Sequence, residues 1–155
     1  MIVVNICAII HIIMLGTYPH QLDDKNRIRI PAKLKAELKD SYTLTKGVDG
    51  CIYVFAVSTF AAHINGKIDE VSIGDKAAQK PLRLLMASAY ETAEDKQGRI
   101  ILPAELIKHA GIKKNVVILG VGNRAEVWDE ERWNAYSGAE NDFDTAMGEL
   151  KNYKI

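Results

Sequence analysis

Two parts of the chain show the same order of hydrophobic and polar positions. In each, a polar turn leads into a short apolar or alternating run, "RIRI" at 27–30 and "RIIL" at 99–102, which is typical of a strand. A proline suited to the first turn of a helix comes next, and Leu34 and Leu38 then recur at helical i, i+4 spacing. Because the second part has the same spacing, both parts are predicted to begin with a turn, a strand and a helix.

Each part continues with two further apolar runs that flank a glycine-containing turn. The runs are "YTLT" (42–45) with "CIYVF" (51–55), and "NVVIL" (115–119) with "AEVW" (125–128). Runs of this length and composition around a turn predict a β-hairpin in each part. A residue suited to cap a helix follows each hairpin: Ser58 and Asp129.

Helices are also predicted between the two parts and at the end of the chain. Apolar residues at helical spacing predict a helix within residues 75–91. Pro81 lies inside this range, so the helix either starts near Lys80 or is kinked at the proline. The acidic stretch from residue 129 is predicted to be helical and to fray toward Tyr153.

The parallel between the two parts is an internal duplication. At an offset of 72 residues, six of the thirteen positions from 22 to 34 are identical, including Asp23 with Asp95 and Arg27 with Arg99. A chain of 155 residues can bury one good core, whereas each copy alone would be marginal, so the copies are predicted to share one pseudo-symmetric core. The predicted segments are an apolar N-terminal extension (1–13), a first repeat (14–62), a linking helical segment (63–91), a second repeat (92–136) and an acidic C-terminal helix or tail (137–155).

The N-terminal extension allows two interpretations. It is apolar, but it is shorter than the roughly 20 residues that span a membrane, and it lacks the basic start and small-residue cleavage site of a signal peptide. Met14 offers a translation start immediately after it. The alternatives are a chain that begins at Met14 and a packed or membrane-touching N-terminal segment.

Composition adds a charge gradient to this picture. The chain is 48% hydrophobic and 26% charged, with a formal net charge of zero. Residues 18–35 nevertheless carry five bases and two acids, a net charge of +3, whereas residues 125–150 carry one base and eight acids, a net charge of −7. The first region is expected to attract polyanions and the second to repel them.

The sequence offers little for catalysis or for a cofactor. Gly120, Gly122 and Ala125 fit the glycine pattern of a dinucleotide-binding turn, but this turn leads into a strand instead of a helix. The glycines are better explained as hairpin residues that need a positive φ. Neither the four histidines nor the two cysteines have metal-ligand or disulfide-framework spacing, so we expect a cytoplasmic protein with no metal, no cofactor and no small-molecule substrate.

The remaining candidate chemistry is the repeated Asp-x-x-x-Arg motif. In a tight turn the carboxylate can accept backbone N–H bonds and orient the arginine four positions later, as a donor fork for phosphate or a guanine edge. A purely structural Asp–Arg pair is the alternative for each motif. The first motif has several basic neighbours, whereas the second has Lys96 set against Glu94 and Glu105. The predicted DNA contacts are therefore Lys25, Arg27, Arg29 and Lys33. The motif residues with orienting or structural roles are Asp23, Asp95 and Arg99.

The segments "LDDKNRIRIPAKLK", "DKQGRIILPAEL" and "VVILGVGNRAEVWDEERW" resemble the MraZ family of bacterial transcriptional regulators, which has two tandem AbrB-like units. The resemblance runs from about Met14 to about Leu150. It implies an α+β, β-rich fold, a pseudo-two-fold swapped-hairpin (double-split) β-barrel with short flanking helices. Asn26, where the family usually has glycine, and Pro81 in the linking helix depart from the family pattern.

The resemblance also implies a function and a set of partners. The expected protein is a non-enzymatic, nucleoid-associated regulator that assembles into a ring-shaped homo-oligomer. It would bind short direct repeats in the promoter of the cell division and cell wall gene cluster, as double-stranded DNA. The alternatives are an antitoxin-like protein-binding module of the same fold and a small nucleotide-binding enzyme that uses the Gly120 turn.

Overall fold

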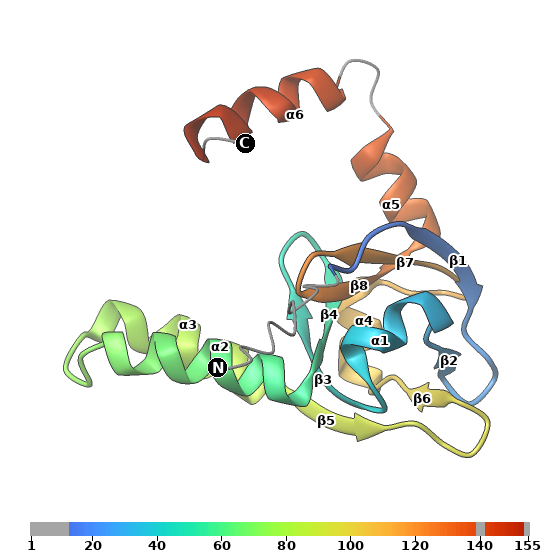
Figure 1. The fold of residues 1–155 in the computed structure, drawn as a ribbon, viewed down its shortest axis with the longest axis horizontal. Coiled ribbons are helices and arrows are strands. Elements are labelled where there is room, and N and C mark those ends of the chain that lie inside the picture. The colour runs from blue at the N-terminus through green and yellow to red at the C-terminus, as the bar shows by residue number, and fades with distance from the viewer. Residues whose placement is uncertain (1–12, 139–141, 154–155) are drawn as a thin grey trace, which may run out of the picture.

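The computed structural model describes residues 13–138 and 142–153 and has a mixed α+β fold (Figure 1). The interpretations of the N-terminal extension therefore fall, apart from residue 13, outside the described residues. One sheet has six antiparallel strands in the order β1-β7-β8-β4-β3-β5, and a second has two antiparallel strands, β2 and β6. The strand bounds are β1 Thr17–Gln21, β2 Arg27–Arg29, β3 Ser41–Gly47, β4 Cys51–Ala56, β5 Tyr90–Ala93, β6 Arg99–Ile101, β7 Asn115–Val121 and β8 Arg124–Asp129.

The pairing of the strands interleaves the two repeats. Strand β1 of the first repeat pairs with β7 of the second, and β5 of the second repeat pairs with β3 of the first. The two predicted hairpins, β3–β4 and β7–β8, are confirmed, and they meet at the centre of the sheet where β4 pairs with β8. Each repeat therefore completes its sheet with a strand from the other one.

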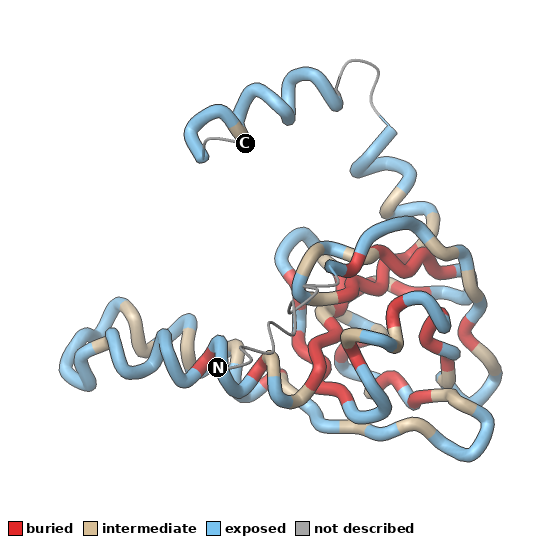
Figure 2. The backbone as a smooth tube through the Cα atoms, viewed as in Figure 1, coloured by how far each residue is buried: buried red, intermediate tan, exposed pale blue. Residues whose placement is uncertain are grey.

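The core is shared by the two repeats, as the chain length predicted. Ile28 and Ile100 pair across the β2–β6 ribbon, and both are 1% exposed. Leu34 and Leu106, at equivalent positions in the two repeats, belong to the same buried cluster. Figure 2 shows that the buried residues gather in the body of strands, whereas the helices that project from it are mostly exposed.

Short helices cover the body and longer ones project from it. The bounds are η1 Ala32–Leu34, α1 Lys35–Leu38, α2 Val57–Glu70, α3 Lys76–Ala87, α4 Ala104–Ala110, α5 Glu130–Ser137, α6 Asp142–Leu150 and η2 Lys151–Tyr153. Helices α2 and α3 form a hairpin-like arm between the repeats, and α5 and α6 extend in another direction (Figure 1).

The structure decides between the two interpretations of Pro81 and corrects one predicted cap. Helix α3 begins at Lys76, where the Asp75 side chain accepts bonds from two backbone N–H groups, so Pro81 lies inside the helix and the alternative start near Lys80 is wrong. Helix α2 begins at Val57 after Ala56, so Ser58 is in the first turn and not at the cap. Asp129 is confirmed as the cap of α5, because its side chain accepts a bond from the Arg132 backbone N–H.

The β7–β8 turn confirms the hairpin interpretation of its glycines, but for two different reasons. Gly122 has φ +70°, a conformation that suits glycine. Gly120 is required by close approach, because a Cβ there would overlap the Leu15 backbone nitrogen. The chain at Met14–Gly16 bonds to this turn through Met14 N–H to Gly122 O (2.8 Å) and Gly120 N–H to Gly16 O (2.9 Å).

Candidate nucleic-acid interface

The first Asp-x-x-x-Arg motif forms a closed turn between β1 and β2. One oxygen of Asp23, Oδ1, accepts bonds from the backbone N–H groups of Lys25 and Arg27, both at 2.9 Å. The other, Oδ2, accepts a bond from Arg27 Nε at 2.7 Å. The carboxylate thus holds the turn and the guanidinium together, as the sequence predicted.

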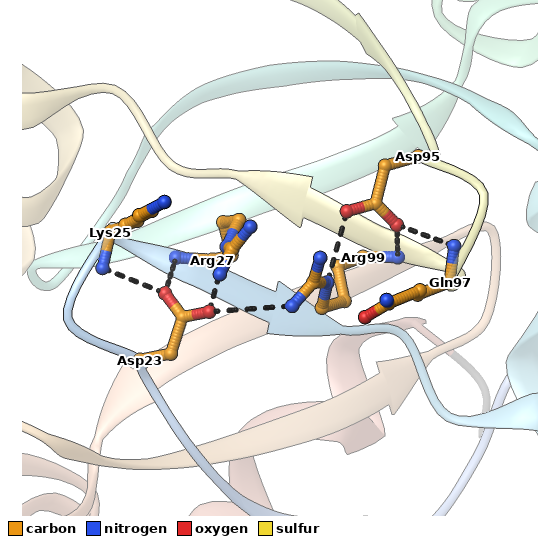
Figure 3. Close-up of polar contacts among 6 residues, drawn as sticks. All are labelled: Asp23, Lys25, Arg27, Asp95, Gln97 and Arg99. Carbon is orange, nitrogen blue, oxygen red and sulfur yellow. Dashed lines mark hydrogen bonds and ion pairs between the residues drawn. The ribbon is translucent and has the colours of Figure 1, made fainter.

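The second motif repeats this geometry between β5 and β6. Asp95 Oδ1 accepts from the backbone N–H groups of Gln97 (2.8 Å) and Arg99 (2.9 Å), and Asp95 Oδ2 accepts from Arg99 Nε at 2.9 Å (Figure 3). The residue before each arginine has a positive φ, +58° at Asn26 and +75° at Gly98. Asparagine adopts this conformation more readily than most residues, so the turn tolerates the departure from glycine.

The hydrogen bonds stabilise both aspartates in the charged form. At Asp23, partial desolvation acts in the opposite direction, but bonds from the backbone and side chain of Arg27 and from the Lys25 backbone lower the pKa below its usual value. At Asp95, the bond from the Arg99 backbone is the largest cause of a lowered pKa. Both carboxylates therefore remain charged at neutral pH and keep the arginines oriented.

Strand pairing places both motif arginines on one face of the β2–β6 ribbon. The ribbon pairs Arg27 with Ile101, Ile28 with Ile100, and Arg29 with Arg99. Directly opposite residues lie on the same face and neighbouring residues on opposite faces, so the buried isoleucines point inward. The outward face of the ribbon therefore carries Arg27, Arg29, Arg99 and Ile101.

The two motif arginines are equally exposed but differently engaged. Their side chains are 24% and 25% exposed, for Arg27 and Arg99 respectively. Arg99 Nη1 also lies 3.9 Å from Asp23 Oδ2, so Arg99 contacts the carboxylates of both turns (Figure 3). Among the described residues, the Nη groups of Arg27 have no hydrogen-bond or ion-pair partner. Arg27 can therefore donate two further nitrogens to a ligand, whereas Arg99 ties the turns together.

The other predicted contact residues lie around this face to different extents. Lys25 is exposed in the first turn, and Arg29 is exposed on the ribbon. Lys33 is exposed in η1, which follows the ribbon instead of forming part of it. Lys35, a further base of the first repeat, is engaged internally, because its Nζ lies 3.1 Å from Glu94 Oε1.

Sequence reasoning missed that Arg99 shares a face with Arg27 and Arg29. Arg29 also approaches the second turn, since a Cβ built at Gly98 would lie 4.0 Å from Arg29 Nη1. The basic surface is thus assembled from both repeats. The local pattern of each repeat contains no signal for this, because it depends on the long-range pairing of β2 with β6.

Other kinds of site are not supported by the described residues. Within them, no cluster of three or more histidine, cysteine, aspartate or glutamate side chains could hold a metal ion. Burial, followed by the charge of Glu126, raises the pKa of the Cys51 thiol to about 12, so this thiol is not a nucleophile at neutral pH. No described helix is both long and apolar enough to cross a membrane.

The chain is similar to proteins of one known family along most of its length. Residues 13–83 and 85–151 each match the family described as "MraZ protein, putative antitoxin-like". The chain is 39% identical to the transcriptional regulator MraZ of Thermoanaerobacter pseudethanolicus over 140 residues, which cover 90% of this chain and 95% of that protein. It is 36% identical to the transcriptional regulator MraZ of Clostridium beijerinckii over 141 residues, covering 91% and 99%.

Proposed function

The chain belongs to the MraZ family of transcriptional regulators, a non-enzymatic family, and from this premise we propose that it binds double-stranded DNA sequence-specifically through the outward face of the β2–β6 ribbon. The proposed contacts are Lys25, Arg27, Arg29 and Lys33, with Arg27 at the centre. Asp23 orients Arg27, while Asp95 and Arg99 maintain the second turn and join it to the first.

The observation that carries this proposal is the state of the Arg27 side chain. Its Nε is fixed by Asp23 at 2.7 Å, and its remaining nitrogens have no hydrogen-bond or ion-pair partner in the described part of the chain. An arginine held in this way is preorganised to donate two parallel bonds to a phosphate or to the O6 and N7 atoms of guanine. Lys25 and Arg29 add charge for phosphate contacts nearby.

A protein of zero net charge gains little from long-range attraction to DNA, so we also propose that several copies act together. A ring-shaped homo-oligomer would present one basic face per subunit and raise the effective concentration of each at neighbouring sites. Short direct repeats match such an array. We propose that they lie in the promoter of the cell division and cell wall gene cluster, where the protein acts in the cytoplasm on the nucleoid.

We also propose that the two sheets close into a barrel, and the interleaved strands support this closure. Strands β1 and β5 continue through the two motif turns into the β2–β6 ribbon, which packs over the shared core. Leu102 N–H donates to Asn26 O at 2.8 Å and so joins the end of β6, in the second repeat, to the motif turn of the first. The six-stranded sheet and the ribbon would together form the swapped-hairpin barrel.

Fluorescence anisotropy with a labelled duplex from the gene's own upstream region tests DNA binding. We expect affinity to fall steeply with salt concentration, because phosphate contacts release counterions. Arg27→Ala should abolish specific binding at moderate salt. Arg83→Ala, which removes an exposed arginine from α3 on the arm, is the matched control and should bind like wild type.

Three outcomes would overturn the proposal. They are the absence of binding to any upstream duplex, affinity that does not change with salt, and equal affinity of Arg27→Ala and wild type. Affinity that does not change with salt would favour the protein-binding alternative. If the protein does bind, footprinting on the same upstream region defines the bound sequence and the spacing of its repeats.

A further inference from the structure

Helix α6 presents an apolar stripe that the described part of its own chain leaves largely uncovered. Phe143, Ala146, Met147 and Leu150 recur at i, i+3, i+4 and i+7, so they share one face of the helix. Phe143 is 73% exposed and Met147 is 41% exposed. Figure 1 shows α6 held clear of the sheet and of the α2–α3 arm.

The internal duplication indicates what α6 lacks. Helices α2 and α3 follow the β3–β4 hairpin of the first repeat, as α5 and α6 follow the β7–β8 hairpin of the second. Leu85 of α3 and the adjoining Ala89 pack against a cluster formed by Phe55, Phe60 and Ile64. No described residue of α6 takes part in any of the buried clusters. Unlike α3, α6 therefore leaves its apolar stripe without a packing surface in the described part of its chain.

A groove of suitable character lies at the base of the arm, between β4, α2, α3 and the β7–β8 turn. It has a volume of about 240 Å³. Its apolar lining includes Tyr53, Phe55, Phe60 and Ile64, and Arg124 and His63 also line it. We propose that α6 of a second copy of this chain docks in this groove, with Phe143 as the anchoring side chain.

The charges of helix and groove do not oppose docking. The α6 sequence carries three acids and no base, and Asp144 and Glu149 flank its apolar stripe on either side. No carboxylate lines the groove, whereas Arg124 does. The Arg124 guanidinium carbon lies 4.6 Å from the centre of the Tyr53 ring, and its Nε and Nη2 each lie 2.9 Å from Glu126 Oε2, so this cation is already paired within its own chain. The acids beside the stripe would therefore meet a groove without a lining carboxylate, while the apolar surfaces supply the contact.

The contact joins two different surfaces, so it is heterologous and repeats from copy to copy. Such contacts form a ring when the rotation between neighbours closes. An aromatic side chain in a largely apolar groove has the character of an interface hot spot. This inference rests on the proposed self-association, and it adds that α6 of one copy contacts the groove of the next.

Light scattering at micromolar protein concentration tests the anchor. Phe143→Asp should reduce the measured mass from that of the oligomer to that of a single chain. Ile73→Asp, which changes a 93% exposed isoleucine at the tip of the arm, is the matched control and should keep the wild-type mass. If wild type is itself monomeric, both self-association and the docking contact are refuted. If wild type is oligomeric and Phe143→Asp keeps its mass, only the docking contact is refuted.

Cross-linking tests which surfaces meet. In a Cys7→Ser background, a chain with His63→Cys and a chain of different size with Met147→Cys would be co-expressed and oxidised. We expect a disulfide-linked heterodimer. Replacing His63→Cys by Ile73→Cys should give none. Failure to form the heterodimer would overturn the contact. So would a double variant, His63→Cys with Met147→Cys, that forms its disulfide only within one chain, because α6 would then occupy its own groove.

Discussion

Ile28 and Ile100 lie directly opposite one another at the centre of the β2–β6 ribbon, and they are equivalent residues of the two repeats. Their contact therefore marks the pseudo-two-fold axis. Because side chains alternate along a strand, the arginines on either side of them must point outward. The residues that join the repeats and the residues proposed to meet DNA are thus set by the same pair of three-residue strands.

Shortening either isoleucine should destabilise the fold. Ile28→Ala or Ile100→Ala removes buried methyl groups at a contact used by both repeats, and we expect a loss of about 2–4 kcal/mol in the free energy of unfolding. Ile101→Ala is the control on the same strand, because Ile101 is 58% exposed. Its effect should stay within about 0.5 kcal/mol. Urea unfolding followed by circular dichroism measures the three variants, and equal losses at Ile101 and Ile100 would contradict the assignment.

Much of this arrangement could be predicted from local patterns. The hairpins, the motif turns and the outward arginines follow from alternation, glycine placement and the Asp-x-x-x-Arg spacing, which all act over a few residues. The local pattern left open whether α3 starts near Lys80 or runs through Pro81, and the bonds that the Asp75 side chain accepts from Ala77 and Ala78 N–H fix the longer helix. The local pattern did not place Arg99 on the same face as Arg27 and Arg29, because that face depends on the pairing of strands 72 residues apart.

At Gly120 the predicted hairpin is correct, but the predicted reason for the glycine is wrong. Its backbone does not have the expected positive φ, and the need for glycine comes from the Met14–Leu15 backbone that crosses it. Gly120→Ala should therefore lower the free energy of unfolding by about 1–3 kcal/mol, because backbone must move to admit the methyl group.

Gly66→Ala is the matched control for that substitution. Gly66 lies within α2, and nothing is within 4 Å of a Cβ at this position. Alanine there should raise the free energy of unfolding by about 0.5–1 kcal/mol, because glycine is unfavourable within a helix. Thermal denaturation of both variants gives the comparison. If the Gly120→Ala protein is as stable as wild type, the Met14–Leu15 backbone does not approach Gly120 this closely.

The two motif aspartates should make stability depend on pH in acid. Their folded-state pKa values lie below the usual 3.8, so the stabilisation is present above that value and is lost as pH falls through the lowered folded-state pKa. Asp95→Asn should be less stable than wild type at pH 7, and the difference should shrink below about pH 4. Urea unfolding between pH 7 and pH 3 measures this, with Asp24→Asn, an exposed neighbour of the first motif, as the control at pH 7. A difference that is constant across the whole range would argue against the charged hydrogen bonds.

Substitutions of the two motif arginines should have different effects, on DNA affinity at Arg27 and on stability at Arg99. Arg27 contacts one carboxylate and leaves its Nη groups for a ligand, so Arg27→Ala should lose DNA affinity with little change in melting temperature. Arg99 contacts the carboxylates of both turns, so Arg99→Ala should lower the melting temperature more than Arg27→Ala does. Arg27→Lys keeps the charge but not the two-nitrogen fork, and it should retain salt-dependent binding while losing preference for the cognate duplex. Anisotropy and melting curves on all three variants give the test. If Arg99→Ala keeps its melting temperature but loses DNA, both arginines read the ligand and the proposed division between them is wrong.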